Sequence, residues 1–209
     1  RGAVSERRLL LASRARHKVA ELQELLDLPG VVLVTPDEVG IEGEPVEDAD
    51  TFEGNAAIKA RYYASRSGGL PVLADDSGLE VDALGGRPGV LTKRYAGDDP
   101  TDVENNTKLL GELDGMPAER RTARYQCVLA FIDPAGGLDP VFRAGTFEGR
   151  IATHPRGHGG FGYDPVFEPI GEPPDGRTVG QMAAAEKHAL SHRGAAARAM
   201  AEYLREEGW

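Results

Sequence analysis

The chain has 209 residues and a formal net charge of −10, with 40% hydrophobic and 28% charged residues. This length and composition suit one globular domain with a sizeable core rather than two independent domains. The acidic balance argues against a DNA- or RNA-binding protein, which usually carries a basic patch, so we expect no nucleic-acid partner.

The single cysteine, Cys127, lies within the apolar run YQCVLAF, and we expect it to be a small core residue. A chain without an internal disulfide fits a reducing compartment. No apolar run has the length of a membrane-spanning helix, and the opening RGAVSERR lacks the hydrophobic region of a signal peptide. The sequence therefore predicts a cytoplasmic protein with no membrane partner, whose residues 1–7 are disordered or added ahead of the domain.

Alternating apolar patterns predict an α/β fold. Runs rich in β-branched residues indicate strands, and apolar residues spaced three to four apart indicate helices. In chain order we expect a strand (8–12), a helix (16–28), a strand (31–35), an acidic loop (36–50), a helix capped by Thr51 (52–66), strands at 71–74 and 79–82, a turn (84–89), a helix with Thr101 as its N-cap (101–113), a hairpin of strands 122–133 and 142–152, and a helix after Ser191. Together they predict one α/β domain with a mixed sheet over residues 8–206.

Two adjacent aspartates, Asp75 and Asp76, follow the apolar run PVLA. Ser77-Gly78 predicts a tight turn directly after them, so the pair would end a buried strand, where open α/β sheets place their sites. Two carboxylates near a low-dielectric core would raise each other's pKa, and a Mg²⁺ ion would remove that penalty. The alternative is a solvated acidic turn.

The acidic loop ends at Glu47-Asp48, which could supply a further metal ligand or belong to a mobile charged surface. Lys18 opens a helix after the first strand, and Lys59 lies on the helix before the aspartates. Each lysine alone could be a solvated surface residue. Together the two could offset the charge of a triphosphate near the metal.

The loop PRGHGGFGYDP, residues 155–165, has the glycine spacing of a dinucleotide-binding fingerprint. That motif must open a helix, whereas Pro165 and β-favouring residues follow here, so we reject the match. Glycines allow a backbone to approach a ligand closely, and Phe161 and Tyr163 could stack on a base. A flexible surface turn is the alternative.

Ser191 has the character of an N-cap, which places His192 and Arg193 in the first turn of the last helix. Cations are unfavourable at that end of a helix, and a broken local rule hints at function. A capped helix with two exposed polar residues is the alternative. These features together predict an enzyme that acts on a nucleoside phosphate.

Five segments carry a resemblance to a known family: TFEGNAAIKA (51–60), LADDSGLEVDALGGRPGV (73–90), RYAG (94–97), GGFGYDPVF (159–167) and EKHALSHRG (186–194). In this order they resemble the inosine triphosphate pyrophosphatase family, the XTP/dITP diphosphatase group that clears deaminated purine nucleotides. The resemblance implies an elongated mixed β-sheet with flanking helices, two lobes with a cleft between them, and a homodimer. It also implies hydrolysis of XTP, dITP and ITP to the monophosphate and pyrophosphate, with Mg²⁺ as cofactor.

The resemblance further implies roles for single residues. Asp76 would be the catalytic carboxylate and would share the metal with Glu47, while Asp75 would support the site. The implied contacts to the purine nucleoside triphosphate are the phosphate ligands Lys18 and Lys59, further contacts at Ser13 and Ser77, the base- and ribose-packing residues Phe161, Gly162, Tyr163 and Asp164, and the purine-reading residues Lys187, His192 and Arg193.

One departure and two rival functions stay open. Ala15 stands where the family usually has Asn, so a substrate contact is missing there or is replaced by Arg14 or Arg16. A pyrophosphatase of the Maf type, acting on other modified nucleotides, is disfavoured by the GFGYDP and SHRG segments. A nucleotide sensor without turnover is disfavoured by the intact Asp75-Asp76 pair.

Overall fold

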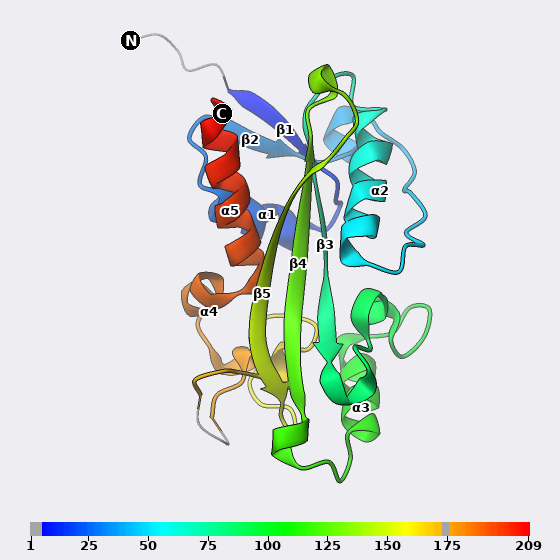
Figure 1. Cartoon of the computed structure of the whole chain (residues 1–209), viewed down its shortest axis with the longest axis vertical. Helices are drawn as coiled ribbons and strands as arrows, with labels where there is room; N and C mark the ends of the chain where they lie inside the picture. The colour runs from blue at the N-terminus through cyan, green and yellow to red at the C-terminus, as the bar shows by residue number, and fades with distance from the viewer. Residues whose placement is uncertain (1–5, 173–175) are drawn as a thin grey trace. The chain divides into compact units, whose positions relative to one another are not determined.

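The structure is a computed structural model that describes residues 6–172 and 176–209. Most of the segment 1–7 that we predicted to precede the domain lies outside the described residues, although Arg7 already belongs to the first strand. The helices and strands (Figure 1) are β1 (Arg7–Leu11), α1 (Arg16–Leu26), β2 (Val31–Val34), α2 (Phe52–Ala64), β3 (Val72–Val81), α3 (Asp102–Glu112), β4 (Thr122–Ile132), β5 (Val141–Ile151), β6 (Phe167–Pro169), α4 (Ala184–Leu190) and α5 (His192–Glu206).

Within the described ranges six strands form one mixed sheet in the order β2-β1-β3-β4-β5-β6. Strand β1 pairs in parallel with both β2 and β3, whereas β5 and β6 pair antiparallel. Leu11, the last residue of β1, lies opposite Leu73 of β3. The prediction of an α/β fold with a mixed sheet and flanking helices is confirmed.

Strand β3 corrects one expectation. The interpretation of two strands separated by a turn at Ser77-Gly78 is wrong, because β3 runs unbroken from Val72 to Val81. Leu79 and Val81 are fully buried, and their burial in the sheet outweighs the turn preference of a Ser-Gly pair. Asp75 and Asp76 therefore lie in the middle of a strand and not at its end.

The chain forms two compact units. Among the described residues, unit 1 comprises 6–76, 127–145 and 193–209, and unit 2 comprises 77–126, 146–172 and 176–192. No helix within the part of the chain that the structure describes combines the length and the apolar composition needed to cross a membrane.

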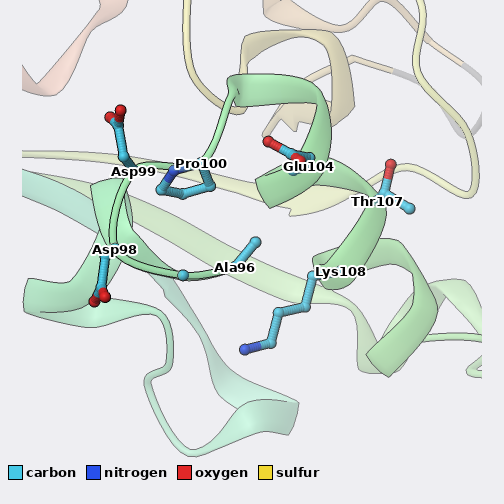
Figure 2. Close-up of a pocket in the computed structure, with 8 residues that line it drawn as sticks. Ala96, Asp98, Asp99, Pro100, Glu104, Thr107 and Lys108 are labelled. Atoms are coloured by element: carbon cyan, nitrogen blue, oxygen red, sulfur yellow. The ribbon is translucent and has the colours of Figure 1, made fainter.

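Unit 2 has its own apolar core, to which Leu79, Tyr125 and Phe167 belong. Helix α3 begins with a capping box between Thr101 and Glu104, which confirms Thr101 as the N-cap. The start of α3 and the turn before it line a hollow of about 530 Å³ (Figure 2), and none of its lining residues is a predicted site residue: Ala96, Gly97, Asp98, Asp99, Pro100, Glu104, Thr107 and Lys108.

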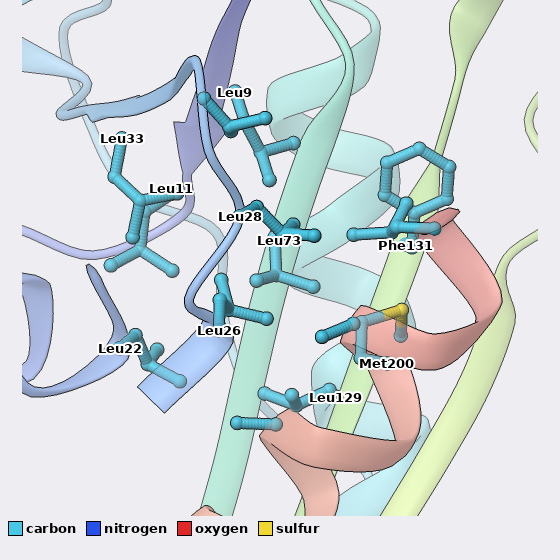
Figure 3. Close-up of a cluster of buried hydrophobic side chains, with 14 of the residues drawn as sticks. Leu9, Leu11, Leu22, Leu26, Leu28, Leu33, Leu73, Leu129, Phe131 and Met200 are labelled. Carbon is cyan, nitrogen blue, oxygen red and sulfur yellow. The ribbon is translucent and has the colours of Figure 1, made fainter. Parts of the chain in front are cut away.

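Unit 1 is built around a second core (Figure 3), in which side chains of α1 and α5 pack against strands β1 to β4. Leu9 and Leu11 of β1 and Leu73 of β3 point into this core. Cys127 is fully buried in the same cluster, which confirms it as a core residue. Helix α2 lies on the opposite side of the strands from α1 and α5 (Figure 1). The two faces of the sheet in unit 1 therefore present different helices to the aspartates of β3.

Candidate active site

Asp75 and Asp76 lie on opposite faces of strand β3. Side chains alternate along a strand, so Asp75 shares a face with Leu73 and with the core under α1 and α5, whereas Asp76 faces α2. Strand β1 ends opposite Leu73, so both aspartates lie just beyond its carboxyl end. Open α/β sheets commonly place ligands at such positions.

Two buried cations hold Asp75 inside unit 1. The side chain of Asp75 is 1% exposed, and Lys18 Nζ donates to its two carboxylate oxygens at 3.0 and 2.9 Å. Arg193 Nη2 lies 3.6 Å from Asp75 Oδ2, and Arg193 Nη1 donates to Glu21 at 2.8 Å. Burial alone would raise the pKa of Asp75, but the charges of Lys18 and Arg193 outweigh burial and hold that pKa well below its ordinary value. Asp75 is therefore an ionised internal anchor.

Asp76 is more accessible, with 14% of its side chain exposed. Lys59 Nζ donates to Asp76 Oδ1 at 3.0 Å and lies 2.9 Å from Glu47 Oε2, so two carboxylates converge on one ammonium. Burial raises the pKa of Asp76, and the charge of Lys59 offsets only part of that rise. Burial would lower the pKa of Lys59, but the carboxylates around it outweigh burial and raise it. Lys59 is thus charged, and Asp76 takes up a proton more readily than an ordinary aspartate.

The local sequence explains how Lys59 reaches this position. Thr51 Oγ1 accepts a hydrogen bond from the Gly54 N–H at 3.0 Å and fixes the start of α2, as predicted. Ala56 and Ala60 of α2 are fully buried. Such small side chains let the helix pack close to the strands, so that the ammonium of Lys59 reaches the β3 carboxylate.

The donor set of this cluster fits Mg²⁺. In residues 6–172 and 176–209 no group of three or more His, Cys, Asp or Glu side chains is placed to hold a metal ion. Mg²⁺ commonly takes only one or two protein carboxylates and completes its coordination with waters and substrate phosphates. Asp76 and Glu47 supply such a pair of oxygen donors, which would be too few for a closed structural zinc site.

The loop between β1 and α1 holds Ser13, whose Oγ accepts a hydrogen bond from the Ala15 N–H at 3.2 Å. Ala15 occupies the N-cap position of α1 and has no side-chain acceptor to offer. Arg14 turns to the acidic loop, where its Nε donates to Asp37 at 2.7 Å. Arg16 is the exposed first residue of α1.

In unit 2 the segment that contains Phe161 is held through Gly162, whose φ of +61° suits a glycine. The Gly162 N–H donates to Asp102 Oδ2 at 2.7 Å, and the Gly162 carbonyl accepts from Asn106 Nδ2 at 2.9 Å. Phe161 is 40% exposed. Tyr163, by contrast, is 2% exposed and belongs to the core of unit 2. Phe161 is therefore the more accessible of the two aromatic rings.

Asp164 joins the cationic and aromatic side chains of this group. Its Oδ2 accepts from Lys187 Nζ at 2.6 Å and from the Phe161 N–H at 3.0 Å, and Tyr125 donates to its Oδ1 at 3.4 Å. Lys187 Nζ also lies 4.3 Å from the centroid of the Phe161 ring. His192 stacks on Tyr125, with 4.8 Å between ring centroids and 8° between ring planes. The ammonium of Lys187, the backbone of Phe161 and the imidazole of His192 thus all lie around Asp164 and Tyr125.

The predicted site residues fall into two groups. Those of unit 1 are Ser13, Lys18, Glu47, Lys59, Asp76 and Arg193, and those of unit 2 are Ser77, Phe161, Gly162, Tyr163, Asp164, Lys187 and His192. Lys18 binds Asp75 and not Asp76 in this structure, and Arg193 is 1% exposed and paired with Glu21. Their predicted contacts with phosphate and purine stay predictions, as does the packing of the buried Tyr163 on a base.

Four residues that contact the predicted site residues were not predicted from the sequence: Glu21, Asp102, Asn106 and Tyr125. Glu21 lies three residues after Lys18, which places both on one face of α1, so helical spacing could have found it. The others could not be found from spacing, because their partners come from distant segments.

Comparison with known proteins assigns the chain to a family. The model of the Ham1 family matches residues 9–203. The dITP/XTP pyrophosphatase of Methylococcus capsulatus is 47% identical over 199 residues, covering 95% of this chain and 96% of that protein. The dITP/XTP pyrophosphatase of Nitratidesulfovibrio vulgaris is 48% identical over 200 residues, covering 93% and 94% of the two chains.

Solved structures agree. The HAM1 protein from Coxiella burnetii has a TM-score of 0.85 and 40% sequence identity, and the match covers 96% of this chain and 99% of that one. The nucleoside-triphosphatase and dITP/XTP pyrophosphatase from Mycobacterium abscessus has a TM-score of 0.75 and 42% identity, with 94% and 98% of the two chains covered. The resemblance seen in the sequence is thereby confirmed, and the chain belongs to the Ham1 family.

Proposed function

We propose that this chain is a Mg²⁺-dependent nucleoside-triphosphate pyrophosphatase that hydrolyses XTP, dITP and ITP to the monophosphate and pyrophosphate, and so removes deaminated purines from the nucleotide pool. The main support for the proposal is that the carboxylates of Asp76 and Glu47 both pair with Lys59. The neighbouring carboxylate of Asp75 is ionised, and its charge is balanced by other cations. The names of its relatives give the substrate class.

Asp76 is the general base of this proposal. Its carboxylate is partly accessible beside Lys59, where it can accept a proton from the attacking water. The water oxygen bonds to the α-phosphorus, the bridging α–β oxygen leaves with pyrophosphate, and the water proton passes to the Asp76 carboxylate. Bound Mg²⁺ would lower the pKa of a coordinated water and neutralise charge that develops on the phosphoryl oxygens.

The cations of unit 1 have different tasks in this proposal. Lys59 is buried between two carboxylates, and its ammonium can move to a phosphate oxygen once a metal shares those carboxylates. Lys18 would contact phosphate from the start of α1 while it keeps Asp75 ionised. Phosphoryl transfer depends mainly on such positioning and electrostatics.

The base-reading part of the proposal concerns unit 2. Phe161 offers an accessible ring for stacking, and Lys187 and His192 bring donors to the same group. Hypoxanthine and xanthine present an oxygen at position 6, whereas adenine presents an amino group that would face these donors and leave them unpaired. Discrimination against ATP is therefore expected to come from these residues.

A homodimer and a cytoplasmic location complete the proposal. The homodimer follows from the family resemblance. The cytoplasmic location follows from the single cysteine, because a chain without an internal disulfide fits a reducing compartment. Light scattering on the purified chain would test the dimer, because a monomeric mass at working concentration contradicts it.

Product analysis tests the proposed reaction. The protein is incubated with Mg²⁺ and ITP, XTP, ATP or GTP in parallel, and nucleotides, phosphate and pyrophosphate are resolved. Monophosphate and pyrophosphate from ITP and XTP, with little from ATP or GTP, support the proposal. Inosine diphosphate with phosphate would mean that another bond is cleaved, and turnover of none of the four would favour the modified-nucleotide or sensor functions.

A further inference from the structure

Glu47 lies in an acidic loop that has no helix or strand of its own over residues 41–51. Its side chain nevertheless meets Lys59 at 2.9 Å, although it is 39% exposed. A loop carboxylate keeps such a position only if the backbone on either side of it is held. An unrestrained loop samples many conformations, and fixing one of them costs conformational entropy.

Arg14 provides the hold before Glu47. Its Nη2 donates to the carbonyl of Ile41 at 2.7 Å, and its Nη1 donates to the carbonyl of Gly43 and to a carboxylate oxygen of Glu44, each at 3.0 Å. The Nε donates to Asp37 at 2.7 Å. One guanidinium thus binds backbone carbonyls and carboxylates along residues 37–44. A lysine could not make the same contacts, because it lacks the rigid planar set of N–H donors.

Helix α2 provides the other attachments. Arg14 Nη1 also donates to the Tyr63 hydroxyl at 3.2 Å, and Tyr62 donates to the carbonyl of Glu42 at 3.3 Å. Beyond Glu47, the N–H of Ala49 donates to Asn55 Oδ1 at 3.0 Å. The loop is therefore tied to α2, the helix that carries Lys59, on both sides of Glu47.

We propose that Arg14 is a positioning residue for the metal site: it fixes the acidic loop so that Glu47 is already in place when the metal binds. The inference rests on the proposed function of Glu47 as a metal ligand. It also gives Arg14 a task other than the substrate contact that Ala15 lacks, because its donors are engaged with the loop.

Metal binding without turnover tests this role. Mn²⁺ is titrated into the protein without nucleotide, and free Mn²⁺ is followed by electron paramagnetic resonance. We expect Arg14→Ala to weaken Mn²⁺ binding about tenfold, the scale of losing a residue that orients a metal ligand. Arg61→Ala is the matched control, because it also removes one positive charge. The side chain of Arg61, on α2, contacts residues 138 and 139 and not the acidic loop. Equal affinity of wild type and Arg14→Ala would overturn the proposal.

A double-mutant cycle separates this proposal from the metal role of Glu47 itself. If Arg14 acts through Glu47, Arg14→Ala has no further effect on Mn²⁺ affinity in a Glu47→Gln background. Additive losses would mean that Arg14 acts elsewhere and would overturn the positioning role. Unchanged affinity in Glu47→Gln alone would instead contradict the proposed function of Glu47.

The conservative variant adds a third test. Arg14→Lys keeps the charge but loses the planar set of donors, so we expect its Mn²⁺ affinity to stay near that of Arg14→Ala. A lysine that restores wild-type affinity would reduce the role of Arg14 to its charge and would contradict the geometric argument.

Discussion

Asp75 and Asp76 are adjacent in the chain, but their side chains leave β3 on opposite faces and meet different helices. Asp75 is bound by Lys18 of α1, and Asp76 by Lys59 of α2. The first carboxylate is fully buried with its pKa held low, and the second is partly accessible with its pKa raised. Paired carboxylates whose environments push their pKa values apart usually divide the tasks of a site. Under the proposed function, this division would give Asp75 an anchoring task and Asp76 the chemical one.

Replacement of Asp76 tests this division. We expect Asp76→Asn to lower kcat by about 10²–10⁴-fold, the range of a lost general base, while the fold is kept. Steady-state kinetics and circular dichroism check both statements. Activity near that of the wild type in a folded Asp76→Asn variant would remove the catalytic assignment.

Acid unfolding tests Asp75. Its pKa in the folded chain lies below the ordinary value of 3.8, so the unfolded chain takes up a proton first as the pH falls. The stabilisation is therefore complete above that value and is lost as the pH drops towards the pKa of the folded state. Urea unfolding of wild type and Asp75→Asn over this range should show a free-energy difference that shrinks with falling pH. A difference independent of pH would contradict the pairing.

His192 and Arg193 are expected to differ although they are neighbours. Loss of Arg193 leaves Glu21 and Asp75 with less compensation in a buried network, so Arg193→Ala should lower the free energy of unfolding by about 3–5 kcal/mol. His192→Ala should mainly lower the ratio of kcat/KM for ITP to that for ATP. Thermal unfolding and kinetics on both substrates distinguish the two. An unchanged substrate ratio in His192→Ala would exclude its part in base selection.

Cys127 should be chemically inert in the folded chain. Burial raises the pKa of its thiol to about 12, so the reactive thiolate is scarce at about pH 8. Iodoacetamide should therefore leave the native protein unlabelled and should add one group per chain in denaturant, which mass spectrometry would show. Rapid labelling of the native protein would mean that this core opens easily.

Much of the fold could be predicted from the sequence because its signals are local. The helix caps Thr51 and Thr101 and the apolar periods of α1, β4 and α5 depend on neighbours within a few residues. The continuous β3 could not be predicted, because the turn preference of Ser77-Gly78 is overridden by burial that only the whole sheet provides. Because the sequence did not predict one strand through both aspartates, it did not predict that Asp75 and Asp76 point to opposite faces of the sheet.

The candidate site shows the same limit. The residue types at Asp76, Glu47 and Lys59 indicated a metal and phosphate site, and the structure brings these three together. The burial of Arg193 was not foreseen, since its partner Glu21 comes from a helix more than 170 residues earlier. Sequence spacing predicts which residues share a helix face, but it does not predict which helices share a face of the sheet.

Hydrolysis in ¹⁸O-labelled water tests the central claim most directly, because it locates the phosphorus that the activated water attacks. The protein converts ITP in the presence of Mg²⁺, and mass spectrometry follows the label in each product. If Asp76 directs water to the α-phosphorus, the label appears in the monophosphate and pyrophosphate stays unlabelled. Label in pyrophosphate would place the attack on the β-phosphorus and would contradict the account.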